Sequence, residues 1–79
     1  MPKLSNAQEA FDTTMMAYSE ILTEINPEVA KEFALWNVEV AQEQAPVTRF
    51  SSSYDPGKKF EVIAHFDGEP QKRFEAKLG

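Results

Sequence analysis

The sequence predicts an α+β domain in which two N-terminal helices pack on one face of a three-stranded antiparallel β-meander, in the order α-α-β-β-β. Apolar residues recur every three or four positions in the first half of the chain and alternate with polar residues in the second half. The chain has 79 residues and no cysteine. We therefore expect one domain, 1–79, with a helical hairpin at about 5–45, a β-meander at about 46–79 and no disulfides.

The first helix is expected to run from Asn6 to Ile25. Ser5 is a favourable N-cap, and Gln8 completes a Ser-x-x-Gln capping box. An apolar stripe then recurs at spacings of three and four, and neither glycine nor proline interrupts it. The stripe consists of Phe11, Met15, Tyr18, Leu22 and Ile25.

The second helix is expected to run from Pro27 to about Gln44, before Pro46. Because Asn26 precedes a proline, it is pushed out of the helical region, and its side chain can cap the next helix. The link is short enough to produce an antiparallel hairpin or a sharp corner. The main apolar stripe consists of Val29, Phe33, Trp36 and Val40. A row of small residues, where we expect the first helix or the sheet to pack, consists of Ala30, Ala34, Asn37 and Ala41.

The second half of the chain has the period of two that is typical of half-buried strands. Apolar and polar residues alternate clearly at 60–67 and again at 73–78, with a turn at 67–70 between them. A third strand is expected at about 47–53, where three serines weaken the pattern. The Tyr-Asp-Pro-Gly segment at 54–57 is a turn signal that would return this strand antiparallel against the next one.

Charge decides our expectation for the register of the second hairpin. Two registers keep the apolar faces in phase. The first sets Phe66 opposite Lys72 across a five-residue loop, and it places Glu61 opposite Lys77. The second places Glu61 opposite Glu75. Because like charges directly opposite each other are unfavourable, the sequence favours the first register.

The predicted core collects the inward-facing residues of all five elements, and we expect Trp36 to lie at its centre. Its members are Phe11, Met15, Tyr18, Leu22, Val29, Phe33, Trp36, Val40, Phe50, Phe60, Val62, Phe66, Phe74 and Leu78.

The sequence contains few residues or motifs that are typical of catalytic or metal sites. With one histidine and no cysteine, the chain has neither a multi-histidine nor a thiolate metal site. It contains no glycine-rich phosphate loop, no calcium loop and no Gly-x-Ser-x-Gly motif. We therefore expect no enzymatic activity, no metal and no cofactor. No run approaches the roughly 18 apolar residues of a membrane span, and no secretory signal is visible, so a cytoplasmic location is expected.

The net charge of −5 is unevenly distributed. Residues 1–45 contain two lysines and eight acidic residues, which sum to −6. Residues 46–79 contain six basic and five acidic residues, which sum to +1. The two halves therefore predict two different surfaces.

The second helix carries the leading candidate site, an acidic face with apolar residues within it. The face consists of Glu28, Glu32, Leu35, Val38, Glu39 and Glu43. It fits a larger protein that has a basic surface with an apolar notch. We expect a small acidic protein-binding module, an inhibitor or adaptor of the kind found in viruses and phages. An acidic surface can mimic nucleic acid in a site built for phosphates, so the partner could be a nucleic-acid-handling protein. The plainer alternative is a solvated helix face with a tolerated hydrophobic residue.

Two further functions stay open at this stage. A small nucleic-acid-binding domain would use the basic residues of the sheet, Arg49, His65, Arg73 and Lys77. Against this, the aromatic residues face the core, and Glu61 and Glu75 dilute the positive charge. A homo-oligomeric structural protein would bury Leu35, Val38 or Ile63 between subunits.

Overall fold

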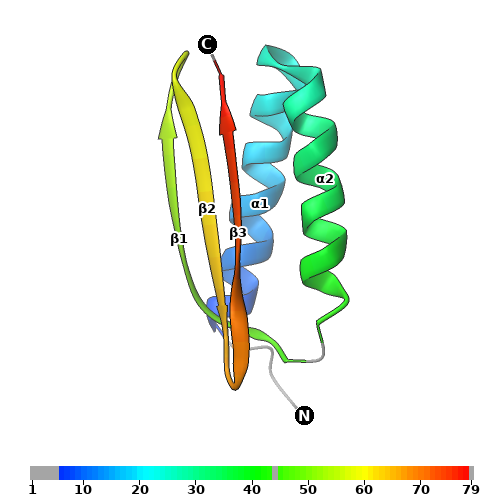
Figure 1. The fold of residues 1–79 in the computed structure, drawn as a ribbon, viewed down its shortest axis with the longest axis vertical. Helices are drawn as coiled ribbons and strands as arrows, with labels where there is room; N and C mark the ends of the chain where they lie inside the picture. Colours follow the sequence, from blue (N-terminus) through cyan, green and yellow to red (C-terminus); the bar gives the residue numbers. More distant parts are fainter. Residues whose placement is uncertain (1–5, 44, 79) are drawn as a thin grey trace.

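The computed structural model describes residues 6–43 and 45–78 and confirms the α-α-β-β-β order. The three strands form one antiparallel sheet in the order β1-β2-β3, and both helices lie on the same side of it (Figure 1). The elements are α1 (Asn6–Ile25), α2 (Pro27–Ala41), β1 (Val47–Asp55), β2 (Lys59–Phe66) and β3 (Glu69–Lys77).

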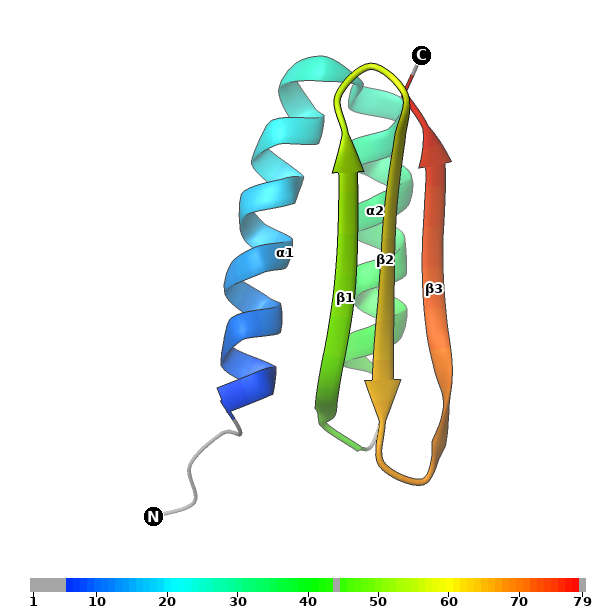
Figure 2. The same cartoon turned by 90° about the vertical axis from the view of Figure 1, so that its left-hand side faces the viewer.

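The helices and strands form two layers, in which α1 packs against β1 and α2 packs against β3. The helices are close together at the end where Asn26 joins them and lie farther apart at the other end (Figures 1 and 2). The Asn26 side chain accepts a hydrogen bond from the Val29 backbone N–H at 3.2 Å, as expected of a helix cap. This short link therefore determines where the two helices can touch.

Helix α1 has the bounds that the sequence predicts, whereas α2 ends earlier, at Ala41 instead of about Gln44. The Gln42 N–H is shared between the carbonyls of Val38 and Glu39, and the Glu43 N–H reaches the Val40 carbonyl at 3.1 Å. These bonds to the third residue back tighten the chain and end the α-helix. Ser5, the predicted N-cap, lies outside the described residues.

Strand β1 extends two residues beyond the predicted end, to Asp55. Its pairing with β2 continues to Asp55 opposite Lys59. The Lys58 N–H then closes the turn on the Asp55 carbonyl at 2.9 Å. Pro56 and Gly57 occupy the central positions, and Gly57 has a φ of 75°, which favours glycine. The three serines at 51–53 therefore do not prevent β1 from forming, because the turn at 55–58 fixes its pairing with β2.

The predicted register of the second hairpin is wrong. Glu61 lies opposite Glu75, and Asp67 and Gly68 alone connect β2 to β3. Gly68 has a φ of 78°, as this tight connection requires. A bulge after Ala64 then places Phe66 opposite Glu69. The short turn therefore prevails over the like-charge pair.

Arg73 removes the repulsion that argued against this register. Its guanidinium forms ion pairs with both Glu61 and Glu75, at 3.1 Å from the Glu75 Oε2 atom. Lys59 lies 3.5 Å from the same Glu75 oxygen. Hydrogen bonding and charge attraction from Glu61 raise the Arg73 pKa further above its already high ordinary value. Two carboxylates that face each other thus share a cation.

The predicted core residues are all buried or packed against the core, and Tyr18, Phe50 and Leu78 are the partly buried ones. The core also contains Ala30, Val47 and Ala64, which were absent from the predicted list. Ile25 closes the predicted stripe of α1 but is 51% exposed. A repeat of three and four residues drifts about 20° per heptad around a straight helix, so the stripe has turned away from the sheet at its end.

Phe33, rather than Trp36, occupies the centre of the core. Its ring is fully buried and has centroid distances of 5.1 Å to Phe60 and 5.2 Å to Phe74. Trp36 stacks on the outer side of this group, 5.9 Å from Phe33. The Trp36 indole nitrogen is buried and has no hydrogen-bond partner. The tryptophan therefore contributes through ring packing alone.

We expect Trp36→Ala to lower the free energy of unfolding by about 3–5 kcal/mol, because it leaves a cavity beside Phe33. Trp36→Phe should cost much less, since the buried N–H that it removes makes no bond. Urea unfolding followed by circular dichroism measures both values. A folded Trp36→Ala protein with almost unchanged stability would contradict this packing.

We expect Arg73→Gln to lower the melting temperature at low salt, because it leaves Glu61 facing Glu75 without a shared cation. The loss should shrink at high salt, which screens the repulsion. Lys77→Gln is the matched control, since it removes the same charge from the same strand and Lys77 forms no ion pair among the described residues. Equal effects of the two substitutions would mean that Arg73 does not offset the repulsion between Glu61 and Glu75.

Candidate partner-binding surface

The outward face of α2 carries two large apolar side chains that nothing in the described structure covers. Leu35 is 64% exposed and Val38 is 54% exposed. They are three residues apart, which places them side by side on the helix. Because Phe33 and Trp36 on the opposite face hold α2 against the sheet, Leu35 and Val38 must point to solvent. Together they form an apolar patch on an otherwise polar surface.

Three glutamates lie beside this patch. Glu28, Glu32 and Glu39 are exposed, and none of them forms an ion pair among the described residues. Lys31 is the only basic residue in α2, and α1 has none. None of these three carboxylates is therefore paired with a cation, and Lys31 lies four residues before Leu35 on the same side of the helix. We call these five residues the α2 surface: Glu28, Glu32, Leu35, Val38 and Glu39.

Glu43, the sixth residue of the predicted face, does not lie with the others. It follows the end of α2, and its carboxylate forms an ion pair with Lys72 of β3 at 3.2 Å. Both side chains are partly buried. The prediction treated Glu43 as part of a longer helix, but the early end of α2 turns it toward the sheet. Glu43 therefore links α2 to β3.

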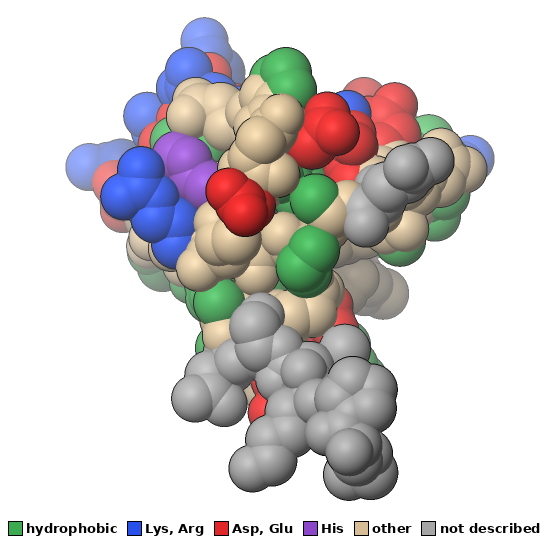
Figure 3. Space-filling view, turned by 90° about the horizontal axis from the view of Figure 1, so that it is seen from below, with side chains coloured by type: hydrophobic (Ala, Val, Ile, Leu, Met, Phe, Trp, Pro, Cys, Tyr) green, Lys and Arg blue, Asp and Glu red, His purple; other side chains and the backbone are tan. Residues whose placement is uncertain are grey.

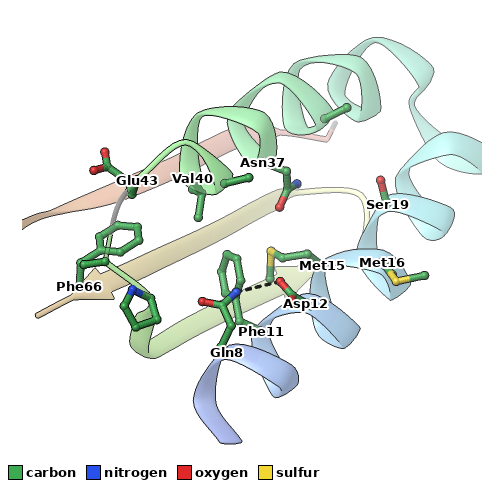
Figure 4. A pocket seen from close by; sticks show the side chains of 14 residues that line it. Gln8, Phe11, Asp12, Met15, Met16, Ser19, Asn37, Val40, Glu43 and Phe66 are labelled. Atoms are coloured by element: carbon green, nitrogen blue, oxygen red, sulfur yellow. Dashed lines mark hydrogen bonds between the residues drawn. The ribbon is translucent and has the colours of Figure 1, made fainter. Parts of the chain in front are cut away.

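A groove of about 770 Å³ lies between the two helices at the end where they diverge (Figure 4). Phe11, Met15 and Val40, which are core residues, form part of its wall. Met16 of α1 also lines it and is 69% exposed. The polar residues that line it are Gln8, Asp12, Ser19, Asn37 and Glu43. The groove is thus largely apolar, with carboxylates at its margin.

The expectation that another element covers the row of small residues on α2 is only half correct. Ala30 is buried and Asn37 is partly buried, whereas Ala34 and Ala41 are exposed and line the groove. The helices meet near the Asn26 link and separate from there, so α1 covers Ala30 and leaves Ala34 and Ala41 open. The row of small residues therefore forms a helix contact at Ala30 and part of the groove wall at Ala34 and Ala41.

The groove and the α2 surface adjoin each other. Val38 is four residues from Ala34 and three from Ala41, so it lies next to both on the helix. Leu35 lies on the far side of Val38. An apolar strip therefore runs from Met16, across the groove, over Val38 to Leu35. Continuous exposed apolar surface of this kind is typical of binding sites.

The four basic residues of the sheet share its outer face, but they do not form one positive patch. His65 lies directly opposite Arg49, whereas Lys77 lies opposite Lys59 at the other end of the sheet. Arg73 between them is paired with two carboxylates. Figure 3 shows a group of Lys and Arg side chains on the sheet side of one end of the molecule. The aromatic rings point to the opposite face, so this surface lacks the stacking platforms of single-strand binders.

The described residues offer no grouping suited to catalysis by His65 or to metal binding. The Thr48 hydroxyl donates a hydrogen bond to the His65 backbone carbonyl at 3.3 Å. No ion pair brings a carboxylate to the His65 ring in the part of the chain that the structure describes. The described chain also has no cluster of three or more metal-ligating side chains. Neither described helix is long and apolar enough to cross a membrane.

The comparisons with known proteins add no functional assignment. Searches of family models, curated proteins and solved structures found no match to this chain.

Proposed function

We propose that this protein is a small binding module that docks on a larger protein through the α2 surface. The observation that carries the proposal is the exposure of Leu35 and Val38 beside unpaired glutamates. Burial of these two side chains at an interface would remove apolar surface from water, which favours association. The partner is expected to present an apolar cavity for Leu35 with lysines or arginines around it.

The charges of the helical layer support a basic partner. Helices α1 and α2 together contain seven acidic residues and one lysine. A surface of one sign attracts the opposite sign over about 10 Å at moderate salt and raises the association rate. The apolar strip then supplies affinity at close range, and the carboxylates select against acidic partners. Binding through apolar contact and charge in this way requires no catalytic group.

The finer proposal is that the protein acts as an inhibitor or adaptor. Carboxylates on a rigid helix present negative charge to lysines and arginines much as phosphates do. A partner that handles nucleic acid has such a site, so a docked α2 surface would block it. The sheet supports the nucleic-acid-binding alternative less well, because Arg73 is paired with two carboxylates and the aromatic rings face the core.

The test is quantitative affinity capture from cells of the source organism with the tagged full chain. We expect a protein partner that wild type retains and that Leu35→Asp weakens by about 30-fold or more, as for a central apolar anchor. Glu32→Lys with Glu39→Lys should slow association and reduce its dependence on salt.

Two control proteins carry the same changes of charge on α1. Thr13→Asp adds one negative charge to an exposed position, and Glu20→Lys with Glu24→Lys reverses two exposed charges. Thr13→Asp should bind as wild type does, and the double reversal on α1 should slow association less than the double reversal on α2, because it lies away from the contact. A partner that all variants retain equally would exclude the α2 surface. Salt-dependent binding to oligonucleotides that Arg49→Gln abolishes would favour the sheet instead.

A further inference from the structure

The two edges of the sheet differ in how open they are to another strand. Strand β3 has a proline, Pro70, together with a bulge opposite Ala64 and Phe66 and the cations Lys72 and Arg73. Prolines, bulges and charges of this kind discourage edge-to-edge pairing. Strand β1 has none of them from Phe50 to Tyr54, and its register with β2 is regular from Arg49 onward. The free edge of β1 is therefore the one that another strand can use.

We propose that this free edge pairs with β1 of a second copy of the chain, antiparallel, about a two-fold axis at Ser52. In this register Arg49 lies directly opposite Asp55 of the second copy, and the symmetry forms this pair twice. Both residues are exposed, and they lie on the outer face of the sheet. Neither forms an ion pair within the described chain. The strand is thus complementary in charge to its own copy.

The inward-facing residues match in the same register. Phe50 lies opposite Tyr54 of the second copy, and both are only partly buried in the single chain. Small serines occupy the centre, where the two strands would approach each other. The neighbouring in-phase registers, about Ser51 or Ser53, set Arg49 or Asp55 opposite a serine and lose both charge pairs. Cross-strand ion pairs and aromatic pairs therefore favour one register.

Helix α1 presents a second matching surface at the same edge of the molecule. Its side toward α2 carries the groove residues, and its opposite side carries an uncharged strip spaced by three and four residues. Two members, Ile21 and Ile25, are 38% and 51% exposed. Because α1 packs on β1, the two-fold axis brings this strip against its own copy, with the helices antiparallel. The strip consists of Ala7, Ala10, Thr14, Ala17, Ile21 and Ile25.

Small residues along most of this strip allow two helices to approach closely, and the isoleucines supply apolar contact. The assembly would join two three-stranded sheets into one continuous sheet with all four helices on one face. It leaves Leu35, Val38 and the groove exposed on each copy. The dimer is therefore independent of the proposed binding function, and either can fail without the other.

The test is the mass of the full chain by sedimentation equilibrium over a range of concentrations. We expect wild type to approach twice the 8.9 kDa of one chain. Arg49→Asp and Asp55→Arg should each raise the dimer dissociation constant by about tenfold or more, since each sets like charges opposite each other twice. The double variant restores opposite charges and should restore the dimer. Lys77→Asp on β3 is the control for the change of charge and should leave the dimer intact.

A second pair of variants tests the helix contact. Ile21→Glu should weaken the dimer, whereas Met16→Glu, on the groove side of the same helix, should not. Circular dichroism confirms that each variant is folded. A wild-type mass of one chain up to about millimolar concentration would overturn the proposal. A dimer that resists the single charge reversals, or that Leu35→Asp disrupts instead, would also overturn it.

Discussion

The short link between the two helices is the constraint on which the rest of this structure depends. Asn26 ends α1 and caps α2, so the helices must touch at one end of the sheet. Both must also cover the aromatic inner face, where Phe33 packs against the rings of Phe60 and Phe74. Helices held together at one end, each packed over a different strand, separate toward the other end. The groove beside Met15 and Val40 is the direct result.

The helical layer and the sheet layer also differ in charge. The two helices contain seven acidic residues and one lysine, whereas in the sheet layer basic and acidic residues pair with one another. In the sheet, the guanidinium of Arg73 forms ion pairs with two carboxylates, which would compete with a phosphate for it. On α2, Glu32 and Glu39 have no cationic partner among the described residues and lie beside exposed apolar side chains. This contrast, rather than the net charge, makes the helical layer the better candidate for binding a partner.

The sequence predicts what depends on local pattern and misses what depends on geometry between elements. The fold class, the bounds of α1 and the burial of Phe33 all follow from periodicity and caps. The register of the β2–β3 hairpin could not be predicted in this way. The prediction compared the charges of facing residues only, without Arg73, which bridges Glu61 and Glu75. The groove was missed for a similar reason, since the exposed alanines of α2 look the same in sequence as covered ones. The position of Glu43 was predicted wrongly because no residue near the end of α2 indicates in the sequence that the helix stops at Ala41.

The central claim is that partners bind the helical layer through Leu35 and Val38. The most direct test is to map the contact in solution, by NMR of the isotopically labelled chain with a captured partner added. The account predicts that backbone amide signals of α2 from Glu32 to Glu39, and the methyl signals of Met16, shift or broaden on binding. Signals of Arg49, His65 and Arg73 on the outer face of the sheet should stay unchanged. Changes confined to that sheet face, with α2 unaffected, would contradict the account.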